Sequence, residues 1–93
     1  MAAKLQPTVA RDTDAALRAL LAETLGLSPA RVAAFTADTE LFGALPEFDS
    51  MAVANLLTGI EERFAVLIED SDVEAEDFAS FASLLAFVER LRS

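Results

Sequence analysis

The sequence predicts an all-α fold: a four-helix bundle with three longer helices, one short third helix and a long loop after the first helix. Three segments carry apolar residues at intervals of three and four, which places those residues on one face of a helix. The turn-forming residues Gly26, Pro29, Gly43 and Pro46 gather between the first two of these segments. A chain of 93 residues is expected to form one domain with one core.

The first helix is predicted over residues 9–25. Pro7 is expected to stop a helix, so residues 1–8 are interpreted as a flexible lead-in and residues 9–92 as the folded domain. Gly26 stands where a left-handed C-terminal cap is common. The main apolar positions of this segment are Val9, Ala16, Leu17, Leu20, Leu21 and Leu25.

Residues 26–48 form a long connection, and a loop of this length inside a small domain needs anchors of its own. Ser28 is expected to start a short helical turn that runs to Val32. The expected anchors are the apolar residues Leu27, Val32, Phe35, Leu41, Phe42 and Leu45.

The second helix is predicted from Ser50 to Phe64, with Asp49 as its N-cap. Its apolar face consists of Val53, Leu56, Leu57, Ile60 and Phe64. Gly59 lies off this face, and a glycine inside a helix costs about 1 kcal/mol relative to alanine. We interpret Gly59 as a chance occurrence on an exposed face; close approach by another backbone is the alternative.

Residues 65–68 are apolar but too few for a strand, and no partner strand is predicted, so we interpret them as a packed, extended connector. A short third helix is expected over residues 72–78, begun by Ser71 or Asp72. Ser80 is the expected cap of the last helix, whose apolar face consists of Phe81, Leu84, Leu85, Val88 and Leu91.

The composition argues against several classes of function. The chain has no cysteine and no histidine, which rules out disulfides and Ser–His or Cys–His nucleophile systems. A net charge of −9 disfavours nucleic acid and anionic membranes as partners and favours proteins with basic patches. The alternative is that the charge serves only solubility. Without a membrane-length apolar run or a secretory signal, a soluble cytoplasmic protein is expected.

The acidic residues do not form a recognisable site. A calcium loop starting at Asp70 would need glycine and glutamate where the chain has Ala75 and Phe81. Glu61 and Glu62 are adjacent in a helix and do not face each other, so we interpret them as surface charges and not as an acid–base pair. We therefore expect no metal site and no enzymatic activity.

Ser50 is the strongest candidate for chemistry. It ends a long connection and opens an amphipathic helix, so its hydroxyl is expected to lie in water. The N–H groups and macrodipole at a helix start stabilise an attached phosphate by about 0.3–1 kcal/mol. Taken alone, the Asp49–Ser50 pair is better explained as a plain helix cap.

Several segments together resemble the acyl carrier protein family. In that family the attachment serine follows an aspartate and precedes leucine or methionine at the start of the second helix. That helix ends in a Glu-Glu-x-Phe stretch, and the last helix opens with a pair similar to Ser80-Phe81. The likeness covers residues 9–92, and the matching segments are Thr39-Glu40-Leu41-Phe42, Asp49-Ser50-Met51, Leu56, Ile60-Glu61-Glu62-Arg63-Phe64 and Ile68.

The resemblance implies a monomeric carrier and not an enzyme. A phosphopantetheinyl transferase, using coenzyme A and Mg²⁺, would attach 4'-phosphopantetheine to Ser50, with Asp49 flanking it. The thiol of this arm would carry acyl groups as thioesters between the enzymes of a fatty acid, polyketide or related pathway. A peptidyl or aminoacyl carrier is one alternative, and an unmodified helical interaction module is another.

The sequence departs from the family pattern around Ser50. Glu47 stands where the family often has glycine, and the stretch with Ala52, Ala54 and Asn55 lacks the usual acidic residues. This suggests a dedicated set of partners that dock with more apolar contact. The docking residues that we predict are Met51, Ala52, Asn55, Thr58, Glu61 and Glu62.

Overall fold

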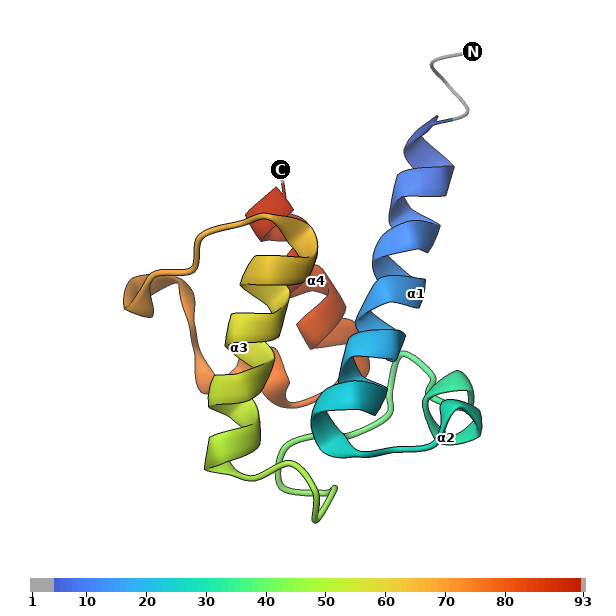
Figure 1. The fold of residues 1–93 in the computed structure, drawn as a ribbon, viewed down its shortest axis with the longest axis vertical. Helices are drawn as coiled ribbons and strands as arrows, with labels where there is room; N and C mark the ends of the chain where they lie inside the picture. The colour runs from blue at the N-terminus through green and yellow to red at the C-terminus, as the bar shows by residue number, and fades with distance from the viewer. Residues whose placement is uncertain (1–4, 93) are drawn as a thin grey trace.

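The computed structural model describes the backbone of residues 5–92 and the side chains of residues 12–92. In Figure 1, α3 and α4 run in one direction and α1 runs in the opposite direction beside them. The expected all-α class is confirmed. In chain order the elements are α1 (Leu5–Leu25), α2 (Pro29–Ala33), α3 (Ser50–Phe64), the 3₁₀ helices η2 (Asp70–Asp72) and η3 (Ala75–Phe78), and α4 (Phe81–Arg92).

Helix α1 begins earlier than predicted. It starts at Leu5, so Pro7 lies in its first turn instead of ending the helix. Proline is tolerated there because the first N–H groups of a helix have no partner within it. Residues 1–4 of the predicted lead-in lie outside the described residues. Gly26 has a φ of 71°, which fits the predicted left-handed cap.

The three long helices bury their apolar faces against one another. Burying one such side chain contributes about 1.5–3 kcal/mol, so these contacts are the main source of the bundle's stability. The buried residues on these helices are Leu17, Leu20, Leu21 and Leu25 of α1, Ala52, Leu56 and Ile60 of α3, and Phe81, Leu84, Phe87 and Val88 of α4.

Gly59 faces α1 and is half-buried, so the expectation that it lies on an exposed face is wrong. A Cβ atom at this position would come within 2.7 Å of Cδ1 of Leu20, which belongs to α1. The space beside Gly59 is therefore occupied by the end of the Leu20 side chain. The alternative interpretation was close approach by another backbone. A neighbour does lie close to Gly59, but it is the side chain of Leu20 and not a backbone.

The long connection between α1 and α3 is anchored by its apolar residues, with one exception. Leu27, Val32, Phe35 and Leu41 are buried, and Leu45 packs against the core while partly exposed. Phe42 does not serve as predicted, because its side chain remains 47% exposed. Ser28 starts α2 as expected, and its hydroxyl accepts a hydrogen bond from the Arg31 N–H at 3.2 Å.

Backbone hydrogen bonds join this connection to the segment that opens α4. The Phe81 N–H donates to the Thr39 carbonyl at 2.9 Å, and the Leu41 N–H donates to the Ala79 carbonyl at 2.9 Å. The Phe42 N–H donates to the Phe78 carbonyl at 3.0 Å. These bonds hold the loop before α3 against the chain that precedes α4.

The short third helix expected over residues 72–78 is present, but it begins only at Ala75 as the 3₁₀ helix η3, and a separate 3₁₀ helix, η2, precedes it. Asp72 accepts a hydrogen bond from the Glu69 N–H, and Asp77 accepts one from the Glu74 N–H. These carboxylates cap two short turns, and the extended Val73 separates them. Aspartate side chains that bond to nearby backbone compete with helix propagation.

The last helix begins as predicted, since the Ser80 hydroxyl accepts a hydrogen bond from the Ser83 N–H at 3.1 Å. Over the described residues, the helices are too short or too polar to cross a membrane.

Candidate functional site

Ser50 is the first residue of α3, and its side chain is exposed. The preceding Asp49 has extended backbone, with φ −98° and ψ −176°, and its Oδ1 accepts a hydrogen bond from the Ala52 N–H at 2.9 Å. Asp49 is therefore the N-cap that the sequence predicts. With the cap role filled by Asp49, the Ser50 hydroxyl is available for chemistry.

Phe48 fixes the chain just before this helix start. Its side chain is only 3% exposed. Its ring is nearly edge-on to the rings of Phe42 and Phe78, with the ring centres 5.8 Å and 6.2 Å apart, respectively. Edge-to-face pairs of this kind are favourable beyond the area that they bury. The core therefore holds the loop in the position that presents Ser50.

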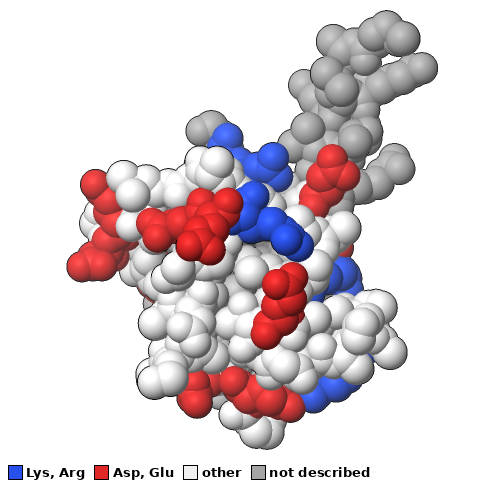
Figure 2. All heavy atoms as spheres, in the orientation of Figure 1, with Lys and Arg blue, Asp and Glu red and all other residues white. Residues whose placement is uncertain are grey.

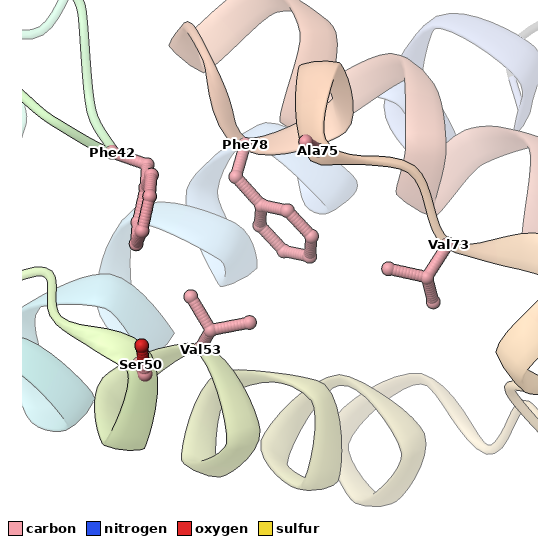
Figure 3. Close-up of a pocket in the computed structure, with 6 residues that line it drawn as sticks. All are labelled: Phe42, Ser50, Val53, Val73, Ala75 and Phe78. Atoms are coloured by element: carbon pink, nitrogen blue, oxygen red, sulfur yellow. The ribbon is translucent and has the colours of Figure 1, made fainter.

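An apolar depression opens beside Ser50, and we call it the Ser50 groove. Its volume is about 290 Å³. Figure 3 shows Val53 and Ser50 on α3 facing Phe42 and Phe78 across it, with Val73 and Ala75 along its side. The sequence assigned Val53 to the core and attached no role to Val73 or Ala75. Only the fold brings these residues together, since they come from the long loop, α3 and the η2–η3 segment.

The carboxylate nearest to the helix start, apart from Asp49, is engaged within the chain. Glu47 Oε2 accepts a hydrogen bond from Arg31 Nη1 at 2.8 Å, and this bond lowers the pKa of Glu47 from its ordinary value. Residues 50–60 of α3 carry no charge. Figure 2 accordingly shows an uncharged surface over the first turns of α3, with acidic side chains gathered over its far end and over the loop beyond.

The predicted docking residues divide into two groups. Met51 is 74% exposed, and Asn55, Thr58 and Glu62 are also exposed. Ala52 is buried at 7% exposure, so its assignment to a docking surface is wrong. The position three after the N-cap turns inward here, although the helical pattern placed Ala52 off the main apolar face.

The Glu61 carboxylate also makes a hydrogen bond within the chain. Its Oε2 accepts a hydrogen bond from the Ile68 N–H at 2.8 Å, which holds the segment after α3 against the helix. Glu61 is half-buried in this position. This carboxylate therefore has a structural contact that the sequence pattern did not indicate.

Comparison with known proteins identifies the family. The family described as phosphopantetheine attachment site matches residues 15–90. The chain belongs to this family of carrier proteins. It is also similar to the holo acyl carrier protein of Nitrosomonas europaea, whose solution structure has a TM-score of 0.74 and 38% sequence identity. That match covers 84% of this chain and 92% of the other. No match was found among curated protein sequences.

The family match and the fold together place the chain in the acyl carrier protein family, whose members are carriers and not enzymes. Its cofactor is covalently attached 4'-phosphopantetheine. The geometry at α3 fits such a group. An exposed serine hydroxyl stands at the positive end of a helix, where an attached phosphate is stabilised. The apolar Ser50 groove begins at the same residue.

Proposed function

We propose that Ser50 is the attachment point of phosphopantetheine and that the protein presents acyl intermediates to the enzymes of a biosynthetic pathway of the fatty acid or polyketide type. The single observation that carries this proposal is the exposed Ser50 hydroxyl at the first position of α3. When bound, the arm supplies a thiol that carries the cargo as a thioester. The chain itself contributes the attachment oxygen, the orientation of the arm and a high local concentration of cargo at a docked enzyme.

The attachment reaction follows from the chemistry of coenzyme A. The Ser50 Oγ forms a bond to the phosphorus on the pantetheine side of the pyrophosphate, and the pyrophosphate P–O bond breaks. Adenosine 3',5'-bisphosphate leaves, and the hydroxyl proton passes to a base on the transferase. This chain has no histidine or cysteine that could act as that base, so Ser50 is a substrate of the transferase.

Incubation with coenzyme A, Mg²⁺ and a broad-specificity phosphopantetheinyl transferase tests the attachment point. We expect a mass gain equal to one phosphopantetheine group in the wild type and none in Ser50→Ala. Ser71→Ala is the matched control, because Ser71 is also exposed but lies in η2 and not at an α-helix start. Modification of Ser50→Ala would overturn the assignment.

The cargo is tested separately. The intact mass of the protein purified from its own host is expected to show the arm with an acyl group. An aminoacyl or peptidyl group on the same arm would instead identify a carrier of amino acid building blocks.

We also propose that partner enzymes dock on a mainly uncharged surface around Ser50, formed by Phe42, Met51, Asn55 and Thr58. Phe42 and Met51 are large, exposed and apolar. The eleven residues from Ser50 to Ile60 carry no charge, although the chain has a net charge of −9. A partner that matches this surface has an apolar patch at its active-site entrance, while basic residues further out can meet Glu62.

The salt dependence of the modification rate tests this docking mode. We expect kcat/KM of the wild type to change less than about threefold between low and high salt, because uncharged contacts are not screened. Met51→Ala is expected to lower kcat/KM about five- to tenfold. Asn55→Glu is the control. It adds a negative charge to this surface, and we expect kcat/KM of this variant to depend on the salt concentration. A steep salt dependence in the wild type would contradict the proposal.

A further inference from the structure

Sulfur is rare in this chain, and one sulfur atom lies beside the proposed attachment point. The sequence has no cysteine, histidine, tryptophan or tyrosine, and its two methionines are Met1 and Met51. Met1 lies outside the described residues. Because cysteine and methionine are the side chains that peroxides oxidise readily, Met51 is the one such target in residues 5–92.

The fold presents this side chain to solvent. Met51 is 74% exposed and is not part of the buried core. It is the second residue of α3 and directly follows Ser50. A methionine inside a core fills space there, and its oxidation disrupts the packing. At Met51 an oxidant can reach the sulfur without any opening of the fold, so oxidation is expected to change the surface and not the stability.

Oxidation would change the chemistry of the proposed docking surface at its apolar part. Residues 50–60 carry no charge, and Phe42 and Met51 are its large exposed apolar side chains. A sulfoxide replaces the apolar thioether by a polar group. A partner's apolar patch would then cover this oxygen without giving it a hydrogen bond, which is unfavourable. We therefore expect the sulfoxide to weaken docking at least as much as Met51→Ala does.

This response is confined to one position on the described surface. The other large exposed apolar side chains are Phe42, at 47% exposure, and Leu67, at 78%. Both are hydrocarbons without a sulfur atom, so peroxide leaves them unchanged. A single oxygen atom added to the described part of the chain would thus act at the residue next to Ser50.

We propose that Met51 is a reversible oxidation site that controls the docking of partner enzymes at Ser50, with hydrogen peroxide as the oxidant. The sulfur donates an electron pair to one peroxide oxygen, the O–O bond breaks, and the second oxygen leaves as water. The sulfur is oxidised by two electrons and the peroxide is reduced. A methionine sulfoxide reductase reverses the step, since its two thiols become a disulfide and the oxygen leaves as water. The inference rests on the proposed docking surface and adds a means of regulating it.

The test compares the full chain before and after treatment with hydrogen peroxide, which is removed before the assay. Peptide mass spectrometry confirms one added oxygen at residue 51, and kcat/KM is measured with coenzyme A, Mg²⁺ and the transferase. We expect oxidation to lower kcat/KM of the wild type at least about five- to tenfold. The thermal midpoint should stay within about 2 °C. Reductases of the A and B types, which act on the two sulfoxide epimers, should restore the rate.

Three variants show whether the position of the sulfur matters, each compared with its own untreated form. Met51→Leu should have the same kcat/KM before and after peroxide, and it also controls for oxidation of Met1. Met51→Leu combined with Leu67→Met is the matched control, because Leu67 is exposed but lies after the end of α3. Its introduced methionine should gain an oxygen without a change in kcat/KM. Met51→Gln, which is polar and unbranched, should lower kcat/KM without any peroxide.

Three outcomes would overturn the inference. The first is an unchanged kcat/KM after complete oxidation of Met51; if Met51→Ala is nevertheless slow, the docking proposal stands and its redox control fails. The second is an equal loss of rate on oxidation of the variant that carries Leu67→Met. The third is a fall of several degrees in the thermal midpoint of the oxidised wild type, which would mean damage to the fold. Absence of any modification in the untreated wild type would instead refute attachment at Ser50, and this inference with it.

Discussion

The two long connections of this bundle are held by different means. The connection before α3 is held by the core: Phe35, Leu41 and Phe48 are buried, and its backbone donates hydrogen bonds to the segment before α4. The connection after α3 has fewer buried residues: Phe78 lies in the core, Val66 and Ile68 pack against it while partly exposed, and the Asp72 and Asp77 carboxylates cap its two turns.

Their exposure differs accordingly. Leu67 of the second connection is 78% exposed, and Val73 is only half-buried beside the Ser50 groove. The first connection fixes where Ser50 stands. The second supplies Val73, Ala75 and Phe78 to the Ser50 groove, and we expect its exposed part to open before the first connection does.

The largest expected difference in stability is between two variants, each of which shortens one apolar side chain in one of the connections. Phe48→Ala is expected to lower the free energy of unfolding by about 3–5 kcal/mol, since it empties a buried site between Phe42 and Phe78. Val73→Ala should cost about 1 kcal/mol or less, because part of that side chain already contacts water. Urea denaturation measures both values. Similar losses of unfolding free energy in the two variants would contradict the expected difference between the two connections.

Arg18 of α1 holds the start of the first connection through hydrogen bonds to its backbone. Its Nη1 donates to the Val32 carbonyl at 2.6 Å and to the Phe35 carbonyl at 2.9 Å. The guanidinium also lies over the ring of Phe81, 4.5 Å from its centre. Arg18→Ala is expected to cost about 2–3 kcal/mol in urea denaturation, since it leaves backbone carbonyls without their charged donor.

Two control variants accompany Arg18→Ala. Arg18→Lys should recover only part of the loss, because lysine has no planar fork to reach several carbonyls. Arg63→Ala should cost less than about 0.5 kcal/mol, since the ion pair of Arg63 with Glu23 is exposed and 3.9 Å long. A loss for Arg63→Ala equal to that for Arg18→Ala would show that charge alone matters here.

The carboxylate caps allow a smaller comparison. Asp49→Ala is expected to cost about 1 kcal/mol, because Asp49 caps a helix of 15 residues. Asp72→Ala, in the exposed turn η2, should cost only a few tenths of a kcal/mol. Thermal unfolding of the two variants and of Asp49→Asn, which keeps the cap, would measure this. Loss of stability in Asp49→Asn comparable to that in Asp49→Ala would argue against capping as the cause.

The Arg31–Glu47 ion pair gives the smallest expected effect, because it is exposed. Arg31 lowers the pKa of Glu47 below its ordinary value of 4.5. The stabilisation is therefore present above the pKa of the unfolded chain and is lost as the pH falls through the lower pKa of the folded state. We expect a small difference in urea midpoint between the wild type and Glu47→Gln at neutral pH, and none once the pH is well below the pKa of Glu47 in the folded state. A difference that grows in acid would contradict the sign.

Much of the fold and part of the site are readable in the sequence. The three helical faces, the Asp49 and Ser80 caps and the anchors of the first connection follow from local spacing and local hydrogen bonding. Gly59 and Ala52 were misjudged because the sequence pattern does not show which neighbour covers a given helix position. Pro7 was misjudged for another reason: the helix begins at Leu5, which places proline in the first turn, where it is tolerated.

The sequence by itself determined an acidic helical bundle with Ser50 at a helix start, because helix faces and N-caps depend on residues only a few positions apart. The tertiary structure decided that Val53, Val73, Ala75 and Phe78 meet beside Ser50, and that Phe42 stays exposed. These residues are far apart along the chain, and only the packing of α3 against both connections brings them to one groove.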